Sequence, residues 1–173
     1  TISTNAGSDT LFGGGGNDVL TAGGGQDILF GNRGDDTIYG GTDFDIIYGN
    51  QDDDRLYGGD AADTLFGGQG NDTIVGEAGN DVMFGNRGED TFLILNGAGM
   101  DRIIGYGLGD DVIAVQTNIN GLAVATEADL AARISNDAEG NAVIDFSGGN
   151  DLTLVGFSAE SLLANLDVAI DIV

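Results

Sequence analysis

Cysteine, histidine, lysine, proline and tryptophan are all missing from this chain of 173 residues. The lack of cysteine excludes disulfide bonds, and without histidine as well the chain has no thiolate or imidazole metal ligands and no common nucleophile–base pair. The lack of proline removes slow prolyl isomerisation as a folding step. We therefore expect no enzymatic activity here, although the chain could be the tail of a larger protein whose upstream domain is an enzyme.

Positive charge is nearly as scarce. Five arginines stand against 29 acidic residues, which leaves a formal charge of −24. So acidic a chain does not suit nucleic acid or an anionic polysaccharide as a partner. Its self-repulsion should keep it expanded unless cations complete the fold. No apolar stretch is long enough to cross a membrane, and nothing at the amino terminus resembles a cleavable signal peptide, so we expect no membrane span.

The chain is rich in a glycine-containing nonapeptide. The best-formed copies are GGGGNDVLT from Gly13, GNRGDDTIY from Gly31 and GGQGNDTIV from Gly67, which define the rule G-G-x-G-x-D-x-U-x with U a large apolar residue. A fixed period of this kind indicates a repeat architecture. Turn propensity alone would not keep aspartate at position six of ten successive copies: Asp9, Asp18, Asp27, Asp36, Asp45, Asp54, Asp63, Asp72, Asp81 and Asp90.

Each nonapeptide supplies one turn and one strand of about three residues, which cannot bury its apolar side alone. Successive strands should therefore alternate between two facing sheets, with two nonapeptides per coil. The sequence predicts an all-β fold, a parallel β-roll that is right-handed by the usual preference. Its core should be two stacks of position-eight side chains, one of Leu11, Leu29, Ile47, Leu65 and Met83 and the other of Leu20, Ile38, Leu56, Ile74 and Phe92.

The chemistry of the turns indicates which cation completes such a roll. Carboxylates and backbone carbonyls make a hard, all-oxygen site, and a flexible cage of six or seven oxygens suits Ca²⁺ better than Mg²⁺. Glycine serves the same purpose, because converging carbonyls need backbone conformations with φ > 0. We therefore expect several bound Ca²⁺ ions.

The nonapeptides over residues 4–93 resemble those of the RTX (repeats-in-toxin) family, which Gram-negative bacteria export through type I secretion. In that family each ion lies between two turns on the same edge of the roll. The earlier turn gives the carbonyls of positions two and four and its aspartate, and the later turn gives the carbonyls of positions one and three and its aspartate.

The resemblance thus implies one site from Gly14, Gly16 and Asp18 with Gly31, Arg33 and Asp36, and another from Gly23, Gly25 and Asp27 with Gly40, Thr42 and Asp45. It assigns further carbonyl ligands to Asn32 and Gly34 with Gly49 and Gln51, to Gly68 and Gly70 with Gly85 and Arg87, and to Gly79.

About eight ions are implied by the same-edge pairs, and they would reduce the formal charge from −24 to about −8. Three consecutive turns replace the position-four glycine by Asp43, Asp52 and Ala61. Aspartate tolerates a left-handed backbone moderately and alanine poorly, so we expect weak or empty sites there. After Asp90 the turns recur with extra residues and place Asp101 and Asp111 at position six. These turns either bind one or two further ions, up to ten in all, or only close the end of the roll.

The sequence predicts a roll over residues 1–93, continued as one elongated unit by residues 94–173, which hold the slipped turns and a cap of antiparallel strands carrying short helices. Thr126 and Asp129 predict a capping box for a helix that includes Ile134. Strands are expected at 141–146 and 151–155, and a second helix from the N-cap Ser158 to Leu166. The final segment Asp167–Val173 resembles a type I export signal or forms an ordinary last strand.

The resemblance implies a calcium-binding module, secreted or on the surface of a Gram-negative bacterium, that folds on Ca²⁺ outside the cell and supports export of a larger protein by the type I secretion machinery. The alternatives are a structural segment of a surface-layer or adhesin-type protein and a polymer- or ice-binding roll, which the irregular position-three residues do not favour. An outward stripe at position nine either stacks along the sheet or contacts an upstream effector domain or a second copy: Phe12, Phe30, Tyr48, Phe66 and Phe84.

Overall fold

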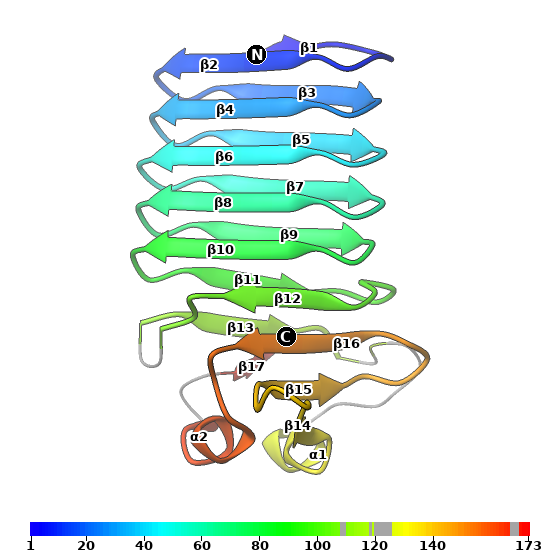
Figure 1. Cartoon of the computed structure of the whole chain (residues 1–173). Helices are drawn as coiled ribbons and strands as arrows, with labels where there is room; N and C mark the ends of the chain where they lie inside the picture. The colour runs from blue at the N-terminus through cyan, green and yellow to red at the C-terminus, as the bar shows by residue number, and fades with distance from the viewer. Residues whose placement is uncertain (108–109, 118, 120–125, 167–169) are drawn as a thin grey trace.

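The structure is a computed structural model that describes residues 1–107, 110–117, 119, 126–166 and 170–173. Parallel strands stacked in two facing sheets form most of the molecule (Figure 1). Among the described residues, one sheet has the strand order β1-β3-β5-β7-β9-β11-β13-β17, and the other has the order β14-β15-β16-β12-β10-β8-β6-β4-β2. Successive strands of the roll therefore alternate between the sheets, and the predicted parallel β-roll is confirmed.

The strands of the roll follow the nonapeptide period. After the short β1 (Ile2–Ser3) they are β2 (Thr10–Gly15), β3 (Val19–Gly24), β4 (Ile28–Arg33), β5 (Thr37–Thr42), β6 (Ile46–Gln51), β7 (Arg55–Asp60), β8 (Thr64–Gln69), β9 (Thr73–Ala78), β10 (Val82–Arg87), β11 (Thr91–Ile94), β12 (Asp101–Ile104) and β13 (Val112–Val115). The residues that pair between strands from β2 to β11 lie eighteen positions apart, as Leu29 and Ile47 do.

The expectation of three-residue strands is wrong, because the strands from β2 to β10 each have six residues. Pairing continues beyond position nine into the next repeat, where Asn32 pairs with Asn50 and Arg33 with Gln51. Glycine-rich backbone can approach the neighbouring coil closely enough to keep this register. The turn proper is thus reduced to positions four to six, which brings the turns of successive coils directly over one another.

The core of the roll consists of the two predicted stacks. All ten position-eight side chains are at most 2% exposed, from Leu11 to Phe92. Successive members are joined in register by the strand pairing, for example Leu20 with Ile38. Because each coil repeats the same apolar contact, the core is long and only two side chains wide.

The coils remain stacked where the repeat slips. Met83 pairs with Ile103, twenty residues later, and Phe92 pairs with Ile113, twenty-one residues later. The inserted residues are accommodated in the turns, so β12 and β13 stay in the two sheets of the roll.

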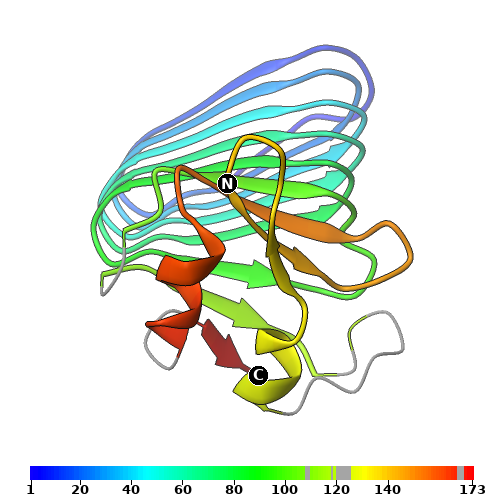
Figure 2. The ribbon, with the colours of Figure 1, turned by 60° about the horizontal axis from the view of Figure 1, so that its bottom comes forward.

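The last strands close the end of the roll that lies opposite the N-terminus (Figure 1), and Figure 2 shows this end turned toward the viewer. Strand β16 (Asp151–Val155) pairs in parallel with β12, and β15 (Ala142–Asp145) and β14 (Ile134–Asn136) then add in antiparallel orientation. Strand β17 (Ile170–Ile172) joins the other sheet beside β13, while residues 167–169 of the suggested export signal lie outside the described residues.

Two short helices accompany these strands. Helix α1 (Glu127–Ala131) begins with the predicted capping box of Thr126 and Asp129, and α2 (Ala159–Leu163) begins at the predicted N-cap Ser158. Both helices end earlier than expected: Ile134 belongs to β14, where it pairs with Ile144, and α2 ends at Leu163 with Ala164 as its C-cap. No described helix is long and apolar enough to cross a membrane.

The position-nine aromatic side chains form a continuous stack on the outer face of the nine-stranded sheet. Adjacent ring centroids from Phe12 to Phe84 lie 4.6–5.0 Å apart, and the ring planes are within 12° of parallel. On the opposite sheet, Tyr39 and Tyr57 stack in the same way at 4.8 Å. The interpretation of the stripe as stacking along the sheet is therefore confirmed, and a further contact with a partner stays a prediction.

Candidate metal centres

The turns of the roll lie along two edges. We call edge 1 the turns that end in Asp18, Asp36, Asp54, Asp72, Asp90 and Asp111, and edge 2 the turns that end in Asp9, Asp27, Asp45, Asp63, Asp81 and Asp101. Edge 1 is on the left of Figure 1 and edge 2 on the right.

On both edges the position-six aspartates form a ladder. The Oδ1 atom of each aspartate accepts the backbone N–H of the aspartate one coil earlier, at N–O distances of 2.7–3.1 Å. From Asp27 onward every member is at most 6% exposed. Ten acidic side chains are thus enclosed in a narrow roll, and within the described residues no arginine forms an ion pair with any of them.

The second carboxylate oxygen of these aspartates has no partner. The Oδ2 atom is buried and makes no hydrogen bond in Asp27, Asp36, Asp45, Asp54, Asp63, Asp72, Asp81 and Asp90. An unpaired buried carboxylate oxygen is strongly unfavourable, because burial removes its hydration without replacing it. In the ionised form these eight oxygens need a cation, and the alternative is that the carboxyl groups take up protons.

Position-one glycines leave room beside that oxygen. A Cβ atom at Gly40 would lie 2.5 Å from Oδ2 of Asp45 and 2.6 Å from the carbonyl oxygen of Gly58 in the next coil on the same edge. Gly58 has the same surroundings, with Asp63 Oδ2 and the Gly76 carbonyl oxygen each at 2.6 Å. Carboxylate and carbonyl oxygens thus converge at this point, as a cation site needs.

This reason for glycine was not predicted from the sequence. The predicted reason, left-handed backbone, holds at positions two and four, where Gly14 has φ 102° and Gly16 has φ 91°. Position one is restricted by space instead in the coils from Gly31 to Gly85, where a Cβ atom would meet an aspartate Oδ2, whereas Thr4 and Ala22 hold this position in two earlier repeats. The signal was present in the sequence, because position two accepts Asn32, Asn50 and Glu77 while the same repeats keep glycine at position one.

The predicted ligand residues are brought together in pairs of turns. Gly14 pairs with Asn32, the N–H of Gly16 donates to the Arg33 carbonyl (2.9 Å), and the N–H of Asp18 donates to Asp36 Oδ1 (2.7 Å). On edge 2 the Gly25 N–H donates to the Thr42 carbonyl (3.3 Å), and that of Asp27 to Asp45 Oδ1 (2.8 Å). Other predicted ligands follow the same register: Gln51 pairs with Arg33, Gly68 pairs with Asn50 and Asn86, and the Gly70 N–H donates to the Arg87 carbonyl. The carbonyl oxygens of Gly49 and Gly85 lie 2.8 and 2.9 Å from the places that a Cβ atom would take at Gly31 and Gly67.

The donor set fits a calcium ion. Each pair of turns offers two aspartates and several backbone carbonyls, which are hard oxygen ligands. Nowhere in the described part of the chain do three or more acidic side chains gather into one metal-binding cluster.

Comparison with known proteins agrees with this geometry. Residues 1–29, 30–65 and 57–92 match the RTX calcium-binding nonapeptide repeat, described as four copies. The chain belongs to the RTX calcium-binding nonapeptide repeat family. No curated protein matches the chain.

The solved structures that are similar to the RTX chain include a lipase and a subunit of an epimerase. The extracellular lipase LipA from Serratia marcescens is 18% identical, with a TM-score of 0.45 over 98% of this chain and 40% of the lipase. The AlgE6R3 subunit of the Azotobacter vinelandii mannuronan C5-epimerase is 23% identical, with a TM-score of 0.27 over 65% of this chain and 78% of that subunit. This chain therefore spans less than half the length of the lipase.

Burial changes the acidity of the RTX aspartates. Desolvation raises the pKa of Asp54 and Asp63 to about 8 and that of Asp72 to about 7. It also raises the pKa of Asp45 and Asp90 to about 6. Hydrogen bonds from the backbone oppose these shifts, and repulsion from neighbouring aspartates adds to them. A metal-free ladder at neutral pH must therefore either keep buried charges that have no counter-charge or take up protons, as Asp54 and Asp63 would.

The three turns without glycine at position four keep the left-handed backbone. Asp43, Asp52 and Ala61 have φ angles of 71°, 75° and 78°. The Asp52 side chain offsets the cost of this left-handed backbone, because its Oδ2 atom accepts the Gly34 N–H (3.0 Å). In the same way, Asp43 Oδ2 accepts the Gly25 N–H (3.3 Å). Alanine has no side-chain acceptor, so the turn of Ala61 has no such compensation.

The slipped turns extend both ladders. The N–H of Asp81 donates to Asp101 Oδ1 (3.0 Å), and that of Asp90 donates to Asp111 Oδ1 (3.1 Å). Asp111 differs from the other members because its Oδ2 accepts the N–H of Gly107 (2.7 Å). The Asp111 carboxylate thus has a partner within its own turn, and the binding of further ions by the slipped turns stays a prediction.

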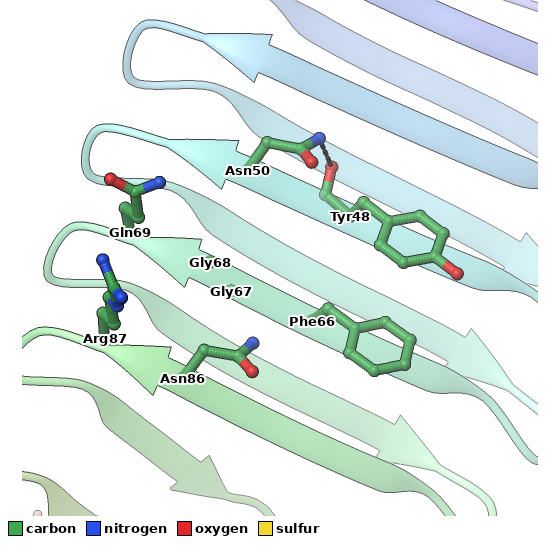
Figure 3. Close-up of a pocket in the computed structure, with 8 residues that line it drawn as sticks. All are labelled: Tyr48, Asn50, Phe66, Gly67, Gly68, Gln69, Asn86 and Arg87. Atoms are coloured by element: carbon green, nitrogen blue, oxygen red, sulfur yellow. Dashed lines mark hydrogen bonds between the residues drawn. The ribbon is translucent and has the colours of Figure 1, made fainter.

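A shallow hollow lies on the outer face of the nine-stranded sheet, around Gly68 (Figure 3). Its lining comprises Tyr48, Asn50, Phe66, Gly67, Gly68, Gln69, Asn86 and Arg87. The Asn50 amide donates to the Tyr48 carbonyl (3.3 Å). The hollow faces solvent, whereas the aspartate ladders face the interior of the roll.

Proposed function

We propose that this chain is a module whose folding is driven by calcium. The observation that carries the proposal is the set of eight buried Oδ2 atoms without partners. Because the roll buries these charges beside a core only two side chains wide, the folded state needs cations to be stable. When bound, Ca²⁺ would supply the positive charge and would connect adjacent turns.

The ligands that we propose are the aspartates and the backbone carbonyls of paired turns. Two aspartates of adjacent turns on one edge would bind each ion, together with the position-two and position-four carbonyls of the earlier turn and the position-one and position-three carbonyls of the later turn. Eight such pairs lie between Asp9 and Asp90, and the slipped turn of Asp101 is a candidate for one more ion. We further propose that residues 94–173, which hold the slipped turns and the cap, are continuous with the roll as one elongated unit.

We infer a role in export from the same physics. Extracellular calcium sites bind at about 10⁻⁴ to 10⁻³ M, far above cytosolic calcium levels. The chain would therefore be unfolded inside the cell, able to pass through a narrow type I secretion channel, and would fold outside. Support comes from the family, from the charge of −24 and from the lack of disulfides and prolines that could delay folding.

A calcium titration of the EDTA-treated chain, followed by far-UV circular dichroism, tests the proposal. We expect a cooperative change from coil to β structure near millimolar Ca²⁺ and none with Mg²⁺ at the same concentration. A chain that is already fully folded in EDTA at neutral pH would contradict the proposal, because the apolar stacks would then suffice.

A further inference from the structure

The two edges of the roll differ at position five. On edge 1 this position holds Asn17, Asp35, Asp53, Asn71 and Glu89. The backbone N–H of each of the last four donates to the side-chain Oδ1 of the residue one coil earlier, at 3.2, 3.3, 2.7 and 2.9 Å in chain order. Edge 1 thus carries a second, exposed ladder, which we call the position-five ladder.

The position-five ladder runs in the opposite sense to the buried one. In the buried ladder the earlier coil donates its N–H to the later coil, as Asp54 does to Asp72. In the position-five ladder the later coil donates, as Asn71 does to Asp53. Adjacent turns on edge 1 are therefore joined in both directions, and their relative position is fixed by protein groups alone.

Edge 2 cannot form this ladder through its centre. Its position-five residues are Ser8, Gln26, Phe44, Ala62, Asn80 and Met100. The side chains of Phe44 and Ala62 contain no hydrogen-bond acceptor, and they occupy two consecutive coils. The bond does form at the slipped end, where the Met100 N–H donates to Asn80 Oδ1 (2.9 Å).

Electrostatics does not favour edge 1. Apart from the position-six aspartates, its turns from Gly13 to Glu89 contain four acidic residues and two arginines, a net charge of −2, whereas those of edge 2 from Thr4 to Asn80 contain three acidic residues and no arginine, a net charge of −3. Any difference in calcium affinity in favour of edge 1 must therefore come from how firmly its turns are held in place before the ion binds. A ligand binds more tightly to a site whose groups are already held in place.

We propose that the two edges are two classes of calcium site, and that edge 1 orders and fills at lower calcium because the position-five ladder holds its turns together. This inference rests on the proposed function, which it extends to an order of binding. The turns of edge 2 then become ordered and bind calcium after edge 1 has begun to form the roll. One net hydrogen bond changes the affinity of the adjoining site by about fivefold.

Calcium titration against a competing chelator tests this order, and the expected result for the parent chain is two classes of site. The double variant Asp53→Ala with Asn71→Ala removes two acceptors of the ladder, and it should weaken the low-calcium class about fivefold for each lost bond. The control variant Asp53→Asn with Asn71→Asp retains both acceptors and the net charge, and it should bind like the parent. Asp60→Ala, which removes one acid from edge 2, controls for the charge lost in the alanine pair.

A gain-of-function variant makes the test independent of destabilisation. Phe44→Asn with Ala62→Asn would supply the two missing acceptors and join the ladder to Asn80. We expect the high-calcium class to tighten about fivefold per new bond and to approach the other class. The inference is overturned if this variant leaves the high-calcium class unchanged, or if the alanine pair and the acceptor-retaining pair bind alike. A parent chain that binds no calcium would overturn the proposed function, and this inference with it.

Discussion

Replacing Asp54 by asparagine should have opposite effects with and without calcium. Asp54 is 1% exposed at the centre of edge 1; its Oδ1 accepts the Asp36 N–H (2.8 Å), and its Oδ2 has no partner. It belongs to two proposed sites, one with the turn of Asp36 and one with the turn of Asp72. An asparagine carbonyl can still accept the Asp36 N–H, so the buried ladder survives while the charge is lost.

The expected magnitude follows from the two shared sites. At a tenfold excess of calcium over its dissociation constant, one site stabilises the fold by about 1.4 kcal/mol, so losing both should lower the free energy of unfolding by about 3 kcal/mol. Without metal, the same substitution should instead raise the free energy of unfolding. There the carboxylate is a buried charge that is repelled by Asp72 and Asp36, and its removal should stabilise the roll.

Urea unfolding followed by far-UV circular dichroism measures both effects, first in calcium and then in EDTA with sucrose to favour the compact state. Asp53→Asn is the matched control, because it removes an exposed charge one residue away and retains the acceptor of the position-five ladder. The reasoning would be refuted if Asp54→Asn were as stable as the parent in calcium, or if it were less folded than the parent in EDTA.

Three further predictions concern other parts of the roll. Burial raises the pKa of Asp54 and Asp63 from 3.8 to about 8, so their contribution to the stability of the metal-free fold is complete below about pH 4 and is lost as the pH rises through 8. The EDTA-treated chain should therefore gain β signal in circular dichroism when the pH is lowered from 8.5 to 5. An unchanged spectrum would contradict this. Gly49→Ala should raise the calcium midpoint severalfold, because the new Cβ would meet Asp54 Oδ2 and would lie 2.7 Å from the Gly67 carbonyl oxygen; Gly15→Ala, whose Cβ meets nothing within 4 Å, should leave the midpoint unchanged in the same titration. Tyr48→Ala should lose two ring contacts, with Phe30 and Phe66, at about 0.5–1.5 kcal/mol each, whereas Tyr39→Ala loses only the contact with Tyr57. Equal decreases in the free energy of unfolding in urea would argue against a role for stacking. Sedimentation of the same variants would show whether the stripe also joins two copies of the chain.

Much of the fold could be predicted because the contacts of a roll repeat with the sequence. Each residue meets the residue eighteen positions away, so a period of nine specifies the pairing of Leu29 with Ile47 and of Asp18 with Asp36 without knowledge of any distant contact. The capping residues Thr126 and Ser158 were predictable for a related reason, since a cap bonds only to its own helix.

Features that depend on the neighbouring coil could not be predicted. The six-residue strands arise because backbone pairing extends through positions one to three, and the helices end early because Ile134 is drawn into a strand pair with Ile144. The hydrogen bond by which Asp52 offsets its left-handed backbone comes from the N–H of Gly34, eighteen residues earlier. In other coils the N–H at the same position four donates to a backbone carbonyl instead, as that of Gly16 does to Arg33.

By itself, then, the sequence determined the period, the two apolar stacks and the oxygen chemistry that favours calcium, because each is a property of one repeat. Only the tertiary structure decided that one oxygen of each buried aspartate lacks a partner, that position-one glycine makes room beside it, and that the two edges are joined differently. Those properties depend on which atoms of adjacent coils meet, and that follows from the stacking of the turns in space.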